Sequence, residues 1–264
     1  MRPAYRPRPD EDRMTGPGDV SKARARYFGR PTANLRVVVR NRYNWMNEFI
    51  GADERGVEIG SGAGLSREFI RCRELLLTDF AGYDWLDVKH VDALRTPFED
   101  ASFDFVISVN VIHHLAHPLR FFAEMNRVLR KGGRLIIQDV SCSMFLRLAL
   151  RLQRHEGYDY NARVFDDDAV CTDPNDPWAG NNAIVDLLFE DEARFFEAVP
   201  YFRRVHRSHS EFLTLLNSGG VIARTSHIPL PMPLMRVVDV FDRALTRAFP
   251  KTFASQIQLV LVKR

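Results

Sequence analysis

The chain has 264 residues, of which 45% are hydrophobic, enough to bury a sizeable core. It has no run of about 18 apolar residues and no apolar core near Met1, so the sequence indicates neither a membrane span nor a signal peptide. Its net charge of +3 comes from residues 1–30, with eight basic and four acidic side chains, and the remaining 29 basic and 30 acidic side chains disfavour a nucleic-acid substrate.

The first predicted element is a flexible segment over 1–30, which is rich in proline and arginine up to Arg13. The rest of the chain, 31–264, is expected to form one domain. Residues 34–50 predict an amphipathic helix whose apolar side carries Leu35, Val38, Val39, Tyr43, Met46 and Phe49.

The most informative motif is Val57-Glu58-Ile59-Gly60-Ser61-Gly62-Ala63-Gly64, an apolar strand end that runs into three glycines spaced two apart. Glycine lets the backbone turn sharply and approach a ligand that a side chain would exclude. Leu65, Phe69 and Ile70 continue at helical spacing, so we expect a helix whose first N–H groups face that ligand. Glu58 lies beside a buried strand and therefore requires a hydrogen-bonding partner. The motif predicts a site for a nucleotide-like cofactor.

Two acids follow at the same edge of the predicted sheet. An apolar strand over 75–78 ends in Asp79, 21 residues after Glu58, where a ribose would be held. A further apolar run ends just before Asp92 and Ala93. Either acid could instead be a solvated strand-end carboxylate, but their placement favours contact with the cofactor.

Two histidines follow the next strand, which is predicted over 105–110 and ends in Asn110. His113 and His114 would then lie at the edge where an open α/β sheet binds its ligands. Imidazole titrates near neutrality, so either ring is a candidate catalytic base. The alternative is that both rings pack or hydrogen-bond a loop. The later elements are a helix over 118–130 stopped by Gly132-Gly133, a strand over 134–140, a helix over 184–198, and strands over 202–207 and 257–262.

Residues 57–140 resemble the class I S-adenosylmethionine-dependent methyltransferases through VEIGSGAG, LLLTDF, VDALRTPFEDASFDFVISVNVIHHL and EMNRVLRKGGRLIIQDV. The resemblance implies a Rossmann-like α/β fold, a mixed seven-stranded sheet with helices on both faces, and a cofactor core at about 50–140. It also implies a set of S-adenosylmethionine contacts: Gly60, Ser61, Gly62 and Gly64 around the methionine and ribose, Glu58 supporting that loop, Asp79 on the ribose hydroxyls, Asp92 and the Ala93 backbone at the adenine amino group, and Asn110 and Val111 beneath the sulfonium. The Tyr27-Phe28 segment would fold over the cofactor.

Two other interpretations stay open. A nicotinamide dinucleotide also binds glycine-rich turns followed by an acid about 20 residues on. The G-x-G-x-G spacing, the acid before the first glycine and the second acid at Asp92 disfavour it. The chain could also be a cofactor-binding regulator without turnover, because a complete glycine turn indicates binding and does not prove catalysis.

Two segments outside the cofactor core are expected to bind or cover the acceptor. The first, 141–184, contains an apolar helix with Phe145, Leu146, Leu148, Leu150 and Leu152. It also holds the candidate acceptor contacts Tyr158, Trp178, Asn181 and Asn182. An aromatic ring beside paired amides suits a sugar, although the same residues could form a tight turn that caps the helix over 184–198.

The second segment is 209–250, in which Pro229, Pro231 and Pro233 precede a helix. Its apolar side consists of Leu234, Val237, Val238, Phe241, Leu245 and Phe249, with Arg236, Arg243 and Arg247 opposite or beside it. We expect this helix to pack over the acceptor pocket, with a membrane surface or a dimer partner as alternatives.

A metal site is not expected. Cys72, Cys142 and Cys171 lie too far apart for paired zinc ligands, and the acidic run 166–168 is typical of a solvated loop. Sparse cysteines also fit a reducing cytoplasm. The sequence therefore predicts a cytoplasmic enzyme that methylates a small molecule or a sugar, such as a surface-polysaccharide or lipid-linked intermediate, at oxygen. C-methylation of an isoprenoid or polyketide-like acceptor is the competing hypothesis, and the oligomeric state is left open.

Overall fold

The computed structural model describes residues 2–7, 19–154, 156–176, 178–222 and 224–264, and every structural statement below concerns these residues. Its first half contains β1 (Ala4–Tyr5), α1 (Val20–Phe28), α2 (Ala33–Tyr43), η1 (Asn44–Phe49), β2 (Arg55–Ile59), η2 (Leu65–Glu68), β3 (Glu74–Asp79), β4 (Val88–Lys89), β5 (Phe103–Val109), η3 (Ile112–His114) and α3 (Pro118–Val128), where η denotes a 3₁₀ helix. The second half contains β6 (Leu129–Val140), α4 (Met144–Gln153), β7 (Tyr158–Asp159), α5 (Ile184–Glu190), α6 (Glu192–Ala198), β8 (Phe202–Ser210), α7 (Leu213–Leu216), α8 (Met232–Ala248), α9 (Pro250–Phe253) and β9 (Gln256–Lys263).

Seven strands form the central sheet in the order β4-β3-β2-β5-β6-β9-β8. The strands β4, β3, β2, β5 and β6 run parallel, and β9 is antiparallel to both β6 and β8. This arrangement confirms the predicted mixed seven-stranded sheet. Because β2, β3, β5 and β6 run in one direction, their carboxyl ends meet at one edge, where such sheets bind ligands.

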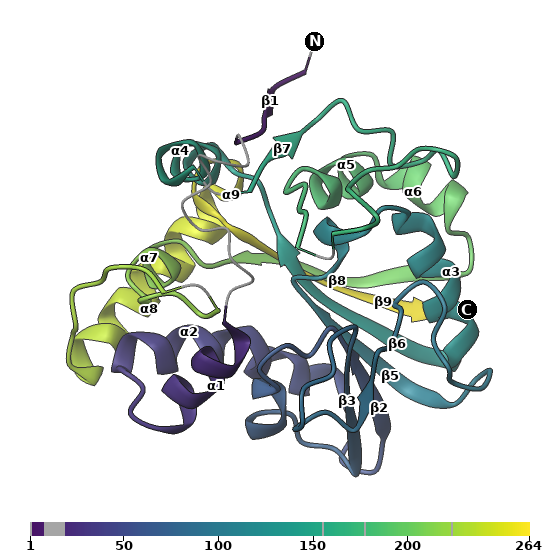
Figure 1. Ribbon diagram of the computed structural model, residues 1–264, viewed down its shortest axis with the longest axis horizontal. Coiled ribbons are helices and arrows are strands. Elements are labelled where there is room, and N and C mark those ends of the chain that lie inside the picture. The colour runs from purple at the N-terminus through teal and green to yellow at the C-terminus, as the bar shows by residue number, and fades with distance from the viewer. Residues whose placement is uncertain (1, 8–18, 155, 177, 223) are drawn as a thin grey trace.

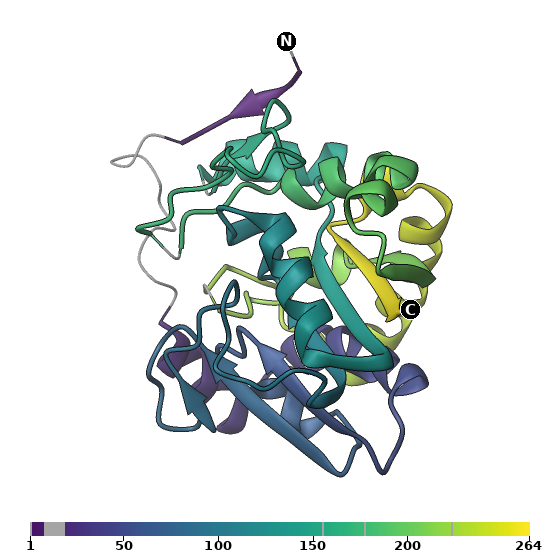
Figure 2. The ribbon, with the colours of Figure 1, turned by 90° about the vertical axis from the view of Figure 1, so that its right-hand side faces the viewer.

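The sheet is covered on both faces (Figure 1), and each face has its own core. Phe121, Phe122 and Met125 of α3 pack with residues of α5 and α6 on one face. Val38 and Val39 of α2 pack on the other face with Val20 of α1. The view in Figure 2 shows the sheet between these layers. Burial on both faces explains why the strands read as continuous apolar runs.

Three predicted elements differ from the elements that the structure shows. The helix expected after the glycine turn is only the 3₁₀ turn η2, because the chain must reach β3 at Glu74. The helix expected over 184–198 is divided at Asp191, whose side chain caps the second part. Gly132 and Gly133 do not stop a helix; α3 ends at Val128, and both glycines lie in β6, next to a register shift.

Part of the segment 1–30, which was expected to be flexible, is folded. Ala4 and Tyr5 pair antiparallel with Asp159 and Tyr158, and Val20–Phe28 forms α1. The expected flexibility of 8–18 concerns residues outside the described ones. Pairing satisfies backbone groups that composition alone cannot assign to a partner.

Helix α8 contradicts the prediction that its apolar side packs over a pocket. Phe241 is 62% exposed, whereas Asp239 and Asp242 are buried. Asp242 accepts hydrogen bonds from the backbone N–H groups of Phe212 and Leu213 and from the hydroxyl of Thr214. The buried acids have partners that the sequence pattern does not show, so they turn the polar side of α8 inward.

None of the helices in the described part of the chain combines the length and the apolar content that crossing a bilayer requires.

Candidate active site

The glycine turn connects β2 to η2 with three residues in the left-handed region, Gly60 (φ 73°), Gly62 (φ 49°) and Gly64 (φ 65°). A Cβ on Gly60 would lie 2.5 Å from Cγ2 of Val111, so any side chain there collides with the end of β5. A Cβ on Gly62 would meet no atom within 4 Å, so this residue faces open space. Ser61 is buried and donates its N–H to the carbonyl of Thr78. The turn therefore leaves room for a ligand at Gly62.

Asp79 is tied directly to this turn. Its carboxylate accepts the N–H of Gly62 at 2.8 Å and the N–H of Ala81 at 2.9 Å. Each oxygen has one such bond, which leaves lone pairs for further donors such as hydroxyl groups. The structure thus brings together the glycine turn and the acid that the sequence placed beside it.

Glu58 lies completely buried beneath the turn. Its Oε2 accepts the hydroxyl of Ser66 at 2.5 Å, and Oε1 has no hydrogen-bond partner among the described residues. Burial raises the pKa of Glu58 to about 7, although the hydroxyl of Ser66 lowers it. The Glu58 side chain thus ties the end of β2 to η2, directly after the glycine turn.

Glu58 should make stability depend on pH. A carboxyl whose pKa is raised in the folded state binds more protons there than in the unfolded chain, so stability falls as pH rises from about 4.5 to 7. We expect urea unfolding to lose about 3 kcal/mol across this interval. Glu58→Gln should remove that loss, whereas Glu99→Gln at an exposed position should keep it. An identical pH dependence in both variants would contradict the assignment.

Asp92 follows Val91, which is bonded to Asp79 at the end of β3. The preceding Val91 donates its N–H to the carbonyl of Asp79, and the exposed Asp92 carboxylate accepts the N–H of Leu94. Asp92 lines a cavity of about 530 Å³, whereas Ala93 packs partly buried against the core. The Val91 bond places Asp92 beside the end of β3, and its carboxylate is accessible.

Asn110 ends β5 with an unusual backbone conformation. Its φ is 55°, and its N–H donates to the carbonyl of Gln138 at 2.8 Å. Its side-chain Oδ1 is buried and has no hydrogen-bond partner among the described residues. A buried polar atom without a partner is costly unless a ligand satisfies it. The Oδ1 of Asn110 is therefore available to a ligand, and the cofactor contact of Asn110 and Val111 stays a prediction.

Two side chains that the sequence did not single out cover the glycine turn. Trp85 donates its indole N–H to the carbonyl of Gly62 at 2.8 Å, and Arg24 of α1 donates to the carbonyl of Ala63 at 2.7 Å. The Arg24 guanidinium also lies over the rings of Trp85 and Phe28. Together with Gly64 these residues line a second cavity of about 390 Å³. Phe28 also lines this cavity, and folding of the Tyr27-Phe28 segment over the cofactor stays a prediction.

His113 is buried and oriented by Asp139, another residue that the sequence did not single out. Its Nδ1 is 2.6 Å from Asp139 Oδ1, which also accepts the N–H of Val140. The second carboxylate oxygen accepts the N–H groups of Val111 and Ile112. Burial lowers the pKa of His113, but the carboxylate of Asp139 outweighs it and leaves that pKa above its usual value. Asp139 follows the same strand-end rule as Asp79, which is the signal that could have found it.

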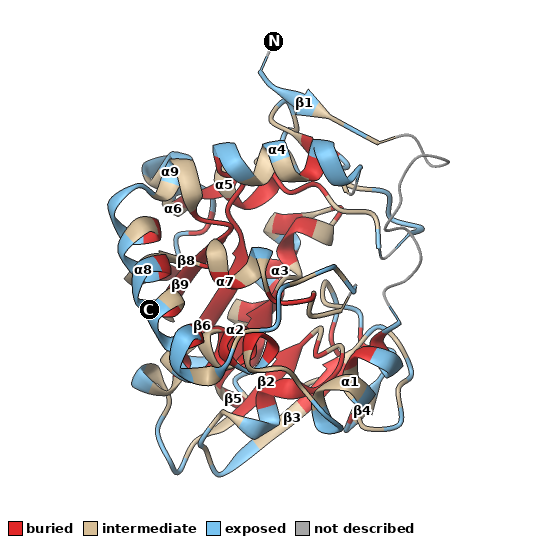
Figure 3. Ribbon diagram, turned by 90° about the vertical axis from the view of Figure 1, so that its left-hand side faces the viewer, coloured by how far each residue is buried: buried red, intermediate tan, exposed pale blue. Residues whose placement is uncertain are grey.

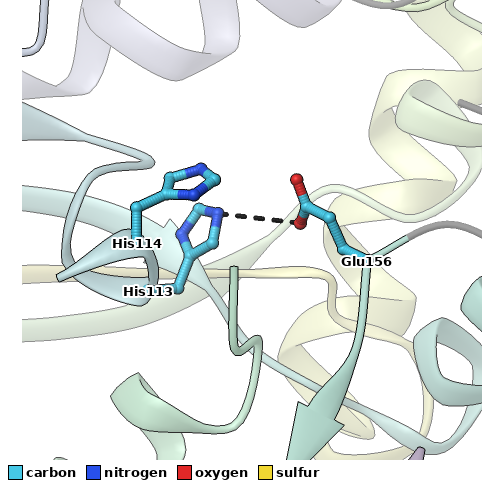
Figure 4. A group of neighbouring side chains, drawn as sticks. All are labelled: His113, His114 and Glu156. Atoms are coloured by element: carbon cyan, nitrogen blue, oxygen red, sulfur yellow. Dashed lines mark ion pairs between the residues drawn. The ribbon is translucent and has the colours of Figure 1, made fainter. Parts of the chain in front are cut away.

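His114 and Glu156 complete a small polar cluster with His113 (Figure 4). The two imidazole rings lie 4.0 Å apart, and His113 Nε2 is 3.9 Å from Glu156 Oε2. Burial, with the neighbouring His113, lowers the pKa of His114 to about 4, so this ring is neutral at pH 7.

These three residues also form a candidate metal cluster, contrary to the absence that the sequence indicated. One ligand atom from each lies within 4.8 Å of the others. Ligands around a tetrahedral zinc lie only about 3.3 Å apart, given metal–nitrogen distances near 2 Å. The side chains would have to close in before they could hold a metal, whereas the His113–Asp139 pair is already arranged to orient a base.

The side-chain amides of Asn181 and Asn182, two candidate acceptor contacts, form hydrogen bonds within the protein. Asn181 is buried, and its Oδ1 accepts the N–H groups of Asp159 and Ala183; Asn182 Nδ2 donates to the carbonyl of Gly157 and to Glu156. These bonds hold the start of α5 and favour the tight-turn alternative.

The two aromatic candidates differ in their exposure to solvent. Tyr158 is only 2% exposed and belongs to the core around β7, where its ring contacts that of Tyr5. Trp178 is 41% exposed, and it is the candidate acceptor contact that remains accessible. The pair cannot act together as one exposed sugar platform.

Comparison with known proteins agrees with this geometry. Residues 57–137 match a family model described as a methyltransferase domain. A phthiotriol/phenolphthiotriol dimycocerosates methyltransferase of Mycobacterium ulcerans is 49% identical over 55 residues, which is 21% of this chain and 20% of that protein. A probable S-adenosylmethionine-dependent methyltransferase of Mycobacterium tuberculosis is 32% identical over 92 residues, 31% of this chain and 34% of that protein. The alignments thus span a fifth to a third of these relatives' length.

The fold has solved counterparts. The crystal structure of an S-adenosylmethionine-dependent methyltransferase from Archaeoglobus fulgidus superposes with a TM-score of 0.53, covering 87% of this chain and 94% of that one at 16% identity. This similarity concerns the fold, whose strand order and glycine turn are described above. The matched segment contains the turn, both acids, Asn110 and the two histidines. The chain therefore has the class I methyltransferase fold, and its residues 57–137 match a methyltransferase domain.

Proposed function

We propose that the chain transfers the methyl group of S-adenosylmethionine to a hydroxyl oxygen of a small organic acceptor. The observation that carries the proposal is the match of residues 57–137 to a methyltransferase domain. The strands of this segment are neighbours in the sheet, so the residues at their carboxyl ends form one continuous edge. The open space at Gly62 and the unpartnered Oδ1 of Asn110 support binding of a ligand along this edge.

The proposed cofactor contacts are Gly60, Ser61, Gly62, Gly64, Asp79, Asp92, Ala93 and Asn110, with Glu58 beneath the loop. Asp79 has lone pairs for ribose hydroxyls, and Asp92 is exposed for an amino group. When bound, S-adenosylmethionine supplies an electrophilic methyl group. The protein's main contribution to such an in-line displacement is to align the two reactants.

His113 is the proposed base. Asp139 accepts from Nδ1, which leaves the lone pair on Nε2 to take a proton. Bound S-adenosylmethionine would supply the methyl group to the acceptor oxygen and become neutral S-adenosylhomocysteine, and Nε2 of His113 would take the hydroxyl proton. The free lone pair lies on the side of the ring that faces Glu156 (Figure 4). An acceptor hydroxyl would have to enter between these side chains.

The proposed acceptor is a small hydroxylated molecule. A sugar loses its main support, because the amides of Asn181 and Asn182 are used within the protein. The Mycobacterium ulcerans relative is named for phthiotriol and phenolphthiotriol dimycocerosates, which supports a hydroxylated acceptor. That support comes from a relative that aligns with this chain over only 55 residues. C-methylation remains the competing outcome, and the position of the transferred methyl in the product distinguishes the two.

Calorimetry of S-adenosylmethionine and S-adenosylhomocysteine tests the cofactor, with NAD in the same series. We expect micromolar binding of the sulfur ligands and a loss of about tenfold to a hundredfold in Asp79→Ala, because hydrogen bonds to charged groups contribute about 1.5–3 kcal/mol. Asp53→Ala is the matched control, since Asp53 is exposed in the turn before β2, at the opposite end of that strand. Tight binding of NAD, or none of either sulfur ligand, would reject the proposal.

A further inference from the structure

Helix α8 presents its apolar side outward. Val240 is 67% exposed and Phe241 is 62% exposed, and Leu234, Val237 and the following Phe249 are exposed as well. Figure 3 shows the outward side of this helix as exposed. Apolar residues scattered singly on a surface need no explanation, but a stripe at helical spacing indicates an interaction site.

Internal bonds fix this orientation. Asp239 accepts from Asn41 at 2.5 Å and from Arg243 at 2.9 Å, while Asp242 holds the start of α7 through backbone N–H groups. Turning the helix over would break these bonds and leave the N–H groups of Phe212 and Leu213 and the hydroxyl of Thr214 without their acceptor. The apolar side of α8 therefore stays outward in the folded protein.

Helix α4 continues the apolar surface. Leu152 is 74% exposed, and Met144, Phe145 and Leu148 are exposed on the same helix. Helix α9 packs against both α4 and α8. The aromatic ring of Phe253 in α9 connects α4 to the end of α8. Its centre is 5.3 Å from the ring centre of Phe145 and 6.3 Å from that of Phe249. We call the exposed set the α4–α8 face: Met144, Phe145, Leu148, Leu152, Leu234, Val237, Val240, Phe241 and Phe249.

The charges beside this face have one sign. The exposed charged residues of α4, α8 and α9 are all basic: Arg151, Arg236, Arg243, Arg247 and Lys251. The acids within these helices are Asp239 and Asp242, and both are buried. A basic rim around an apolar stripe is the pattern of a helix that lies in the interface of an anionic membrane.

We propose that the α4–α8 face binds the surface of a membrane that contains anionic phospholipids, with the apolar side chains entering the boundary between headgroups and acyl chains. The arginines and Lys251 meet the phosphates at the rim. A second copy of the chain fits less well, because a two-fold interface would place this basic rim against itself. The inference rests on the exposed face alone and does not depend on the methyl-transfer proposal.

Vesicle flotation of the full chain tests the proposal. We expect at least about tenfold stronger binding to phosphatidylcholine vesicles that contain a third of phosphatidylglycerol than to phosphatidylcholine alone, since each basic residue near the surface contributes about a fivefold gain. Raising sodium chloride to about 0.5 M should weaken this binding. Arg236→Gln together with Arg247→Gln, both at exposed positions, should reduce it by about tenfold or more.

Phe241→Ser should lower the vesicle affinity by about tenfold to a hundredfold, the effect of losing one inserted phenylalanine. Phe80→Ser is the matched control, because Phe80 is 61% exposed and follows β3, near the sheet edge opposite β8, on which α8 packs. Thermal melting should show both variants folded, since both side chains are exposed.

Three results would overturn the proposal. The first is no binding to the anionic vesicles by the wild-type chain. The second is an equal loss of binding in Phe241→Ser and Phe80→Ser. The third is a dimer, seen by light scattering, that Phe241→Ser dissociates while vesicle binding stays absent; this would assign the face to a second copy of the chain.

Discussion

Asp139→Asn is expected to lower kcat for methyl transfer by about a hundredfold to ten-thousandfold, the range seen when a base loses the carboxylate that orients it. Asp139 acts as a positioning residue, because its carboxylate accepts from His113 Nδ1 and from the N–H groups of Val111, Ile112 and Val140. An asparagine places an N–H₂ group against one of these donors and releases the imidazole from the tautomer that leaves Nε2 free.

The pH profile separates positioning from a purely structural role. The proposed base must be deprotonated, and the pKa of His113 lies above 6.5, so kcat/KM of the wild type should rise with pH through a midpoint above that value. Removing the carboxylate removes what raises this pKa, so the midpoint of Asp139→Asn should move to lower pH. A lower rate with an unmoved midpoint would leave Asp139 only a structural part of the turn.

His113→Gln is the companion variant. It should lower kcat as far as Asp139→Asn does, and the two changes together should cost little more than either alone, because they remove one unit. Fully additive losses would show that the two residues act separately. Binding of S-adenosylmethionine should change little in either variant, since neither side chain is among the proposed cofactor contacts.

Local features of the sequence were enough to predict the glycine turn and its acid. Gly60, Gly62 and Gly64 do adopt positive φ, and Asp79 does bond the turn, because a strand, a turn and the next parallel strand fix one another's geometry over short distances. Asp139 obeys the same strand-end rule and was overlooked beside the more conspicuous histidines.

Features that depend on distant partners could not be predicted. The outward face of α8 follows from the bonds of Asp239 to Asn41 and of Asp242 to α7, which join parts of the chain far apart in sequence. Helical periodicity finds the apolar side of a helix but does not say which side is inward. The amides of Asn181 and Asn182 illustrate the same limit, since their use in a turn depends on β7 and Gly157.

The glycine turn gives the second large effect. Gly60→Ala should destabilise the protein by about 2–4 kcal/mol, because it adds a Cβ at 2.5 Å from Val111 Cγ2 to a backbone at φ 73°. Gly62→Ala has a similar backbone but open space, so we expect only about 1 kcal/mol from strain. Urea unfolding measures both, and equal losses would show that backbone strain alone matters.

Gly62→Ala should lose more affinity for S-adenosylmethionine than Gly60→Ala does, although Gly60→Ala loses more stability. The methyl group of Gly62→Ala enters the space proposed for S-adenosylmethionine, so its binding should weaken by at least about tenfold while the fold persists, a loss near 1.4 kcal/mol. Val111→Ala should rescue the stability of Gly60→Ala by removing the colliding methyl groups, and it should leave Gly62→Ala unchanged. If Gly62→Ala binds S-adenosylmethionine as the wild type does, the open space beside this glycine is not where the cofactor lies, and the ligand must approach the turn from another side.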